Sequence, residues 1–103
     1  MVTYFTTVLG NGEICPISEM VGRRRVRAIE PRSREGKKLL RSGQVTIQVR
    51  DGRCFSGMPV MEIFDRLVAD VHREAVDPST DPRAREELGR LGETLSVQRA
   101  DYS

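Results

Sequence analysis

The clearest pattern of apolar and polar positions lies in the middle of the chain. Across residues 44–50 apolar and polar side chains alternate, which is typical of a strand with one buried face. Asp51-Gly52 favours a tight turn, and a short return strand is expected at residues 53–55. The apolar residues of 59–75 then recur every three or four positions and cover an arc of about 160°, which predicts an amphipathic helix. Such a helix needs a sheet on which to pack its apolar face.

The N-terminal segment predicts a β-hairpin. Residues 3–9 are rich in β-branched and aromatic side chains, and Asn11-Gly12 is a strong hairpin signal. We therefore expect residues 3–9 to pair with residues 13–17. Pro16 has no backbone donor and is expected to place the second strand at an edge or to end it.

A third strand and a short helix follow the hairpin. Residues 24–29 alternate again, and we expect Val26 and Ala28 to face inward while the arginines between them face outward. Ser33 can cap the start of a short helix, and Gly43 suits the left-handed conformation at its end.

The last quarter of the chain predicts a linker, a helix and a tail. Residues 77–82 contain two prolines and are expected to connect two helices. The second helix is predicted over residues 83–95, where a narrow stripe of leucines is weakened by Gly89 and Gly92. Residues 96–103 are expected to form a flexible tail.

Together these elements predict an α+β fold for a core domain of residues 1–76. Its sheet is mostly antiparallel, has four to five strands and is covered on one face by a long amphipathic helix, with a shorter C-terminal helix after it. The side chains expected in the core are the apolar ones of the strands and the long helix, namely Phe5, Val8, Ile14, Val26, Ile29, Val45, Ile47, Val49, Phe55, Ile63, Phe64, Leu67 and Val71.

Length and composition favour a small cytoplasmic domain. The chain has 103 residues, 38% hydrophobic and 31% charged, which suits one modest core. It shows neither a long apolar run nor a basic segment followed by an apolar one, so no membrane span or leader is expected. Cys15 and Cys54 are expected to be buried, reduced thiols. With a single histidine and no Cys-x-x-Cys, the sequence lacks the ligand spacing of a structural zinc site, and no metal or cofactor is expected.

Positive charge is concentrated in one fifth of the chain. The formal net charge is only +2, yet residues 22–43 carry nine basic residues against two acidic ones. Such a cluster can neutralise the phosphates of a nucleic acid or face an acidic protein. No aromatic residue lies within the cluster, so recognition of unpaired bases by stacking is not expected. The candidate binding residues are Arg23, Arg24, Arg25, Arg27, Arg32, Arg34, Lys37, Lys38 and Arg41.

Other chemistry has weaker support. His72 lies at the margin of the apolar arc, where a packing role is expected and proton transfer, alone or with a cysteine nucleophile, is the alternative. No phosphate-binding loop is present. We therefore expect a small non-enzymatic cytosolic protein that binds nucleic-acid backbone through residues 23–41. The alternative is a protein-interaction module, such as an inhibitor, immunity or adaptor protein. It would use the basic stretch or the leucine stripe, which could also support a homodimer through Leu88, Leu91 and Leu95.

Overall fold

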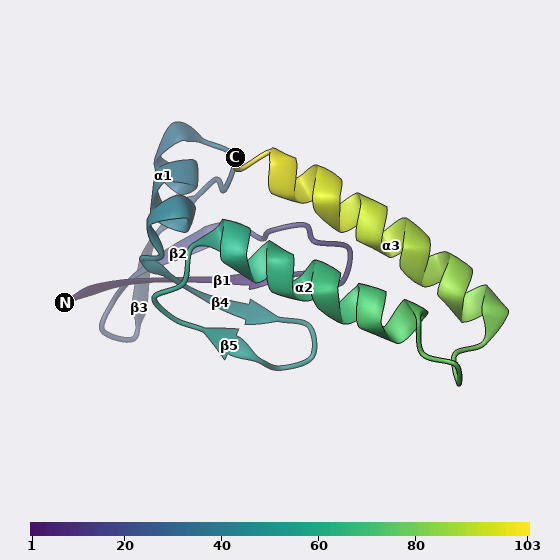
Figure 1. The fold of residues 1–103 in the computed structure, drawn as a ribbon. Helices are drawn as coiled ribbons and strands as arrows, with labels where there is room; N and C mark the ends of the chain where they lie inside the picture. Colours follow the sequence, from purple (N-terminus) through teal and green to yellow (C-terminus); the bar gives the residue numbers. More distant parts are fainter.

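The computed structural model describes residues 1–103 and has an α+β fold. One sheet contains five strands, β1 (Val2–Val8), β2 (Ile17–Val21), β3 (Arg24–Ile29), β4 (Val45–Val49) and β5 (Cys54–Phe55). Across the sheet their order is β3-β2-β1-β4-β5, and only β1 and β4 are parallel neighbours. The three helices are α1 (Arg34–Ser42), α2 (Val60–Ala75) and α3 (Pro82–Ala100). Figure 1 shows α2 lying over the sheet and α3 packed alongside α2.

The local signals around α1 act as predicted. The Ser33 hydroxyl accepts a hydrogen bond from the Gly36 N–H at 3.0 Å, which satisfies one of the free donors at the start of the helix. Gly43 ends the helix with a φ of 78°, and its N–H donates to the Leu39 carbonyl.

The fold includes no helix that is both long enough and apolar enough to cross a membrane.

The second strand of the N-terminal hairpin lies further along the chain than predicted. Pairing after the Asn11-Gly12 turn is limited to an isolated bridge between Val8 and Ile14, and β2 begins only after Pro16. Proline cannot donate to a ladder, so continuous pairing resumes at Ile17. The expectation that Pro16 places the second strand at an edge or ends it is wrong, because β2 begins just after Pro16 and lies between β1 and β3.

The prediction that Val26 and Ala28 of β3 face inward is wrong, since every residue of this strand except Ile29 is exposed. Val26 is 50% exposed and Ala28 is exposed, whereas Ile29 is buried. Residues two apart on a strand share a face, so Arg27 lies on the same side as Ile29. A register shift opposite Glu19 and Met20 changes the alternation near Val26.

α3 is longer than predicted and belongs to the same core as the sheet. It continues to Ala100, five residues beyond the expected end at Leu95. Leu95 is 3% exposed and Tyr102 only 1%, and the Tyr102 ring stacks on Phe64 with ring centroids 6.1 Å apart. The prediction of a flexible tail over residues 96–103 is therefore wrong.

Fourteen buried apolar side chains form one core. Two predicted members, Phe5 and Val26, are wrong, since they are 38% and 50% exposed. Phe5 pairs with Ser18 and Thr46 on the face of the sheet away from the buried residues of β4. Eight predicted members are buried, namely Val8, Ile14, Ile29, Val45, Ile47, Val49, Ile63 and Phe64, and three pack partly buried against them, namely Phe55, Leu67 and Val71. The buried residues missed by the prediction are Ile17, Leu39, Leu40, Val60, Leu95 and Tyr102.

Candidate functional site

The nine basic residues of the predicted surface lie on neighbouring elements. Arg23 is in the turn before β3, and three arginines follow on β3 itself. Arg32 lies in the loop before α1, and the remaining four residues are on α1. Arg27 of β3 hydrogen-bonds Glu35 of α1, so the first turn of α1 lies beside the edge strand (Figure 1). The fold therefore brings β3 and α1 to the same side of the molecule.

Arg27 is the centre of an ion cluster within the chain. Its Nη2 atom lies 2.8 Å from a Glu19 oxygen and 2.6 Å from a Glu35 oxygen. The hydrogen bond from Arg27 holds the pKa of Glu19 below its usual range, and Glu35 and Glu19 together raise the pKa of Arg27. Two carboxylates thus neutralise this guanidinium, and Arg27 ties β2, β3 and α1 together instead of presenting a free charge.

Arg41 also acts within the chain. Its Nε donates to the Tyr102 carbonyl at 2.6 Å, and its Nη2 donates to the Ser103 carbonyl at 2.8 Å. Both acceptors belong to the segment just after α3, more than 60 residues away in sequence. Arg41 therefore fastens the end of the described chain to α1.

Arg32 strengthens the same attachment. Its Nη2 lies 3.0 Å from an Asp101 carboxylate oxygen and donates to the Gln98 side-chain oxygen at 3.1 Å. Asp101 and Gln98 lie at the end of α3, so both partners come from the same segment as those of Arg41. Three of the nine predicted binding residues, Arg27, Arg32 and Arg41, thus have structural partners.

The burial of Tyr102 predicts a dependence of stability on alkaline pH. Burial raises the pKa of Tyr102 above its ordinary value of 10.0. A raised folded-state pKa contributes stability that is complete below the unfolded-state pKa and is lost as the pH rises through the folded-state pKa. We expect wild type to lose more stability than Tyr102→Phe between about pH 8 and pH 11. Denaturant midpoints at the two pH values measure this, and equal losses in the two proteins would contradict it.

Six basic residues remain without an intramolecular partner, and we call them the free basic surface. None of them forms an ion pair or donates a side-chain hydrogen bond within the chain. All are exposed except Lys37, which is half-buried. The members are Arg23, Arg24, Arg25, Arg34, Lys37 and Lys38.

The two thiols and the histidine lie on separate elements of the fold. Cys15 is half-buried in the segment before β2 and Cys54 is exposed on β5, and both are free thiols. They are unpaired as predicted, although the expectation that both are buried is wrong. His72 is exposed on α2, and no group of three or more His, Cys, Asp or Glu side chains is placed to hold a metal ion.

The leucine stripe of α3 packs within the chain. Leu95 is a core residue, and Leu91 packs partly buried against the same core. Leu88 is half-buried. Leu95 is therefore not available to a partner or to a second copy while α3 packs on the core, and only Leu88 and Leu91 keep exposed surface.

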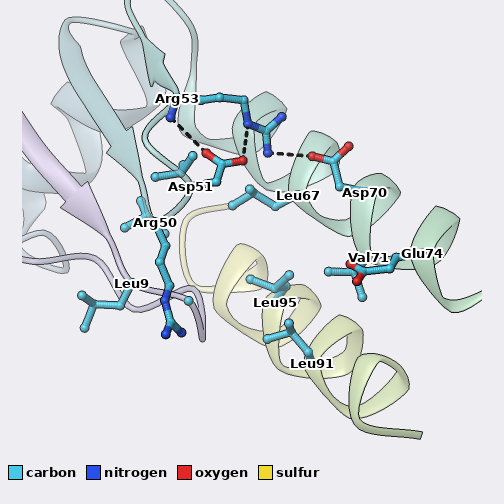
Figure 2. A pocket seen from close by; sticks show the side chains of 13 residues that line it. Leu9, Arg50, Asp51, Arg53, Leu67, Asp70, Val71, Glu74, Leu91 and Leu95 are labelled. Atoms are coloured by element: carbon cyan, nitrogen blue, oxygen red, sulfur yellow. Dashed lines mark hydrogen bonds and ion pairs between the residues drawn. The ribbon is translucent and has the colours of Figure 1, made fainter. Parts of the chain in front are cut away.

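A pocket of about 510 Å³, not anticipated from the sequence, lies between one end of the sheet and the α2–α3 pair. Figure 2 shows Arg50 entering from the end of β4, with Val71 and Glu74 on the α2 side. Leu91 and Leu95 of α3 line it from below in this view. Periodicity assigns these apolar residues to packing, and Arg50 adjoins a turn signal, so the sequence offers no sign that they share a cavity.

Comparisons of the chain with protein-family models, with curated proteins and with solved structures found no match.

Proposed function

We propose that the protein binds the phosphate backbone of nucleic acids through the free basic surface and has no enzymatic activity of its own. The observation that carries the proposal is that six cations on β3, its preceding turn and α1 have no partner within the chain. Lysine and arginine side chains that neutralise phosphates release condensed counterions, which drives association. Uncommitted cations on two adjacent elements are suited to that role.

The surface is suited to backbone contacts more than to reading bases. Single-stranded bases are recognised by stacking on exposed aromatic rings. The free basic surface includes no aromatic residue, and the rings of Phe64 and Tyr102 are buried in the core. We therefore expect similar affinities for unrelated sequences, since phosphate contacts carry no sequence information.

Removing three of the free cations tests this proposal. The triple variant Arg24→Ala, Arg25→Ala and Lys38→Ala is expected to weaken binding to random duplex DNA and to flatten the dependence of log K on log salt. The slope should change by about 0.9 for each lost phosphate contact, and so by about 2.7 if all three residues contact phosphate. Fluorescence anisotropy of a labelled duplex between about 50 and 200 mM salt measures both quantities.

A matched control removes three exposed arginines from elsewhere on the molecule. Arg66, Arg83 and Arg90 lie on α2 and α3 and have no ion-pair partner. Their triple alanine variant has the same net charge as the test variant, so an equal effect of both would indicate a general charge effect. No binding of wild type to duplex or single-stranded DNA or RNA at about 50 mM salt would exclude the proposal.

An acidic protein segment is the second candidate partner, and the exposed edge of β3 favours it. β3 is the outermost strand of the sheet, and five of its six residues are exposed. An extended peptide can add to such an edge through backbone hydrogen bonds, and acidic side chains would complement Arg24 and Arg25. The test adds a peptide of alternating Glu and Val residues and follows exchange of the β3 amide hydrogens. Slower exchange at β3, together with no binding of the protein to nucleic acid, would support this second candidate.

A further inference from the structure

We propose that the pocket at the end of the sheet is a binding site for a small organic anion with an apolar body, such as a medium-chain carboxylate. The site is separate from the free basic surface and does not depend on the proposed nucleic-acid binding. Its support comes from the lining of the pocket, its place in the sheet and the state of its charged side chains.

The floor and walls of the pocket are suited to an apolar body. Seven of its 13 lining residues are hydrophobic, and its volume of about 510 Å³ lies within the range of small-molecule sites. The apolar contributors come from strand ends, from the loop after β1 and from both long helices, namely Val8, Leu9, Val49, Leu67, Val71, Leu91 and Leu95. Three separate parts of the fold therefore meet around one apolar space.

The pocket lies at the carboxyl ends of the two parallel strands. Val8 ends β1 and Val49 ends β4, and these two residues are paired in the register. Ligands of sheets with parallel strands often bind in the crevice beyond these carboxyl ends, where the loops diverge. The parallel β1–β4 pair places the pocket in the same position in this fold.

One of the cations that line the pocket has no ion-pair partner within the chain. Arg53 lies between Asp51 at 2.6 Å and Asp70 at 2.8 Å (Figure 2), so its charge is satisfied within the chain. Asp70 has a second partner in Arg73 at 3.3 Å. Arg50 has neither an ion pair nor a side-chain hydrogen bond, and it is the free guanidinium of the pocket.

Gly10 allows Arg50 to lie along the wall of the pocket. A Cβ atom built on Gly10 would be 2.7 Å from the Arg50 Nη1 atom and 3.0 Å from its Cδ atom. Any larger residue at this position would therefore displace the guanidinium. The absence of a side chain at Gly10 and the position of Arg50 together form the anion-binding side of the proposed site.

Glu74 sets the direction in which a ligand would bind. Its carboxylate lies on the α2 side of the pocket and has no cation partner. An anionic head group is attracted to Arg50 and repelled by Glu74, so we place the head group at Arg50 and the apolar body between α2 and α3. A cationic amphiphile would bind in the opposite sense, which makes the charge of the head group the decisive property to test.

Three probes of equal chain length test the proposal on the 103-residue protein. Octanoate, octanol and octylamine are titrated separately while amide chemical shifts are followed by NMR. We expect octanoate to bind most tightly, with the largest shift changes at Gly10, Arg50 and Val71. Octylamine binding as tightly as octanoate, or octanoate shifting no amide that lines the pocket, would overturn the proposal.

Two substitutions act on the anion-binding side by different routes. Arg50→Gln removes the positive charge. Gly10→Ala keeps the charge but displaces the Arg50 guanidinium from its position. Each substitution is expected to lower the affinity for octanoate about fivefold, which is the effect of losing a partly exposed ion pair. The affinity for octanol should stay nearly unchanged. Arg66→Gln on the exposed side of α2 is the control and should bind octanoate like wild type. If neither pocket variant changes the preference for octanoate over octanol, the site does not recognise anions and the proposal fails.

Discussion

Replacement of Tyr102 by alanine is expected to lower the free energy of unfolding by about 3–5 kcal/mol, the usual cost of truncating a buried aromatic side chain. Tyr102 is 1% exposed and stacks on Phe64 with an angle of 20° between the rings. A domain of this size has a total stability of about 5–15 kcal/mol, so the variant would lose a large share of it. The midpoint of guanidinium unfolding, followed by circular dichroism, measures the loss.

Tyr102→Phe is the matched control for this experiment. It keeps the aromatic ring and its stacking on Phe64, so most of the stability should remain. Should Tyr102→Ala unfold at the same denaturant concentration as wild type, the segment after α3 would not be part of the core, and the flexible tail expected from the sequence would be correct after all.

Gly36→Ala is expected to destabilise the protein, although alanine is the better helix former. A Cβ atom on Gly36 would lie 2.1 Å from the Glu30 carbonyl oxygen and 2.8 Å from that of Pro31. Both atoms belong to the backbone, which cannot turn aside as a flexible side chain can. The cost of such overpacking, about 1–3 kcal/mol or more, exceeds the gain of about 1 kcal/mol in helix propensity.

Gly89→Ala is the matched comparison, because the same substitution is expected to stabilise the protein at this position. Gly89 also lies in a helix, and a Cβ atom there would meet nothing within 4 Å. The variant should therefore be more stable than wild type by up to about 1 kcal/mol. Thermal unfolding of both variants beside wild type measures the contrast, and a stabilised Gly36→Ala would show that α1 does not pack against the Glu30–Pro31 backbone.

The elements that could be predicted from the sequence are those specified by neighbouring residues. Ser33 and Gly43 bracket α1 through hydrogen bonds to residues three or four positions away. The spacing of Ile63 and Phe64 along α2 identifies its buried face in the same way, because both belong to one helical stripe. The α+β class follows from such local signals, because each element is recognisable by itself.

The core residues were predicted wrongly where burial depends on which face of the sheet the helices cover. Alternation shows that Val8 and Phe5 lie on opposite faces of β1, since they are separated by an odd number of positions. It does not show which face receives the helices. Val8 is 1% exposed and Phe5 is 38% exposed, so only the first of these two apolar residues belongs to the core.

The candidate sites depended even more on contacts between distant residues. The basic stretch was visible as composition, but Arg41 has its partners at Tyr102 and Ser103, and nothing near Arg41 in the sequence identifies them. The pocket likewise requires residues from β1, β4 and both long helices to meet. Local patterns therefore identified the charge but could not show which cations are neutralised within the chain.

The exposed edge of β3 also bears on how copies of the protein behave in concentrated solution. An unpaired strand edge is a template for edge-to-edge aggregation, and charged side chains along the edge are a common protection against it. Arg24 and Arg25 lie on this edge and are not neutralised by any carboxylate of the chain. Two copies that approached each other along β3 would bring like charges together. We therefore expect the arginines proposed to contact phosphate to hinder edge-to-edge pairing of two copies as well.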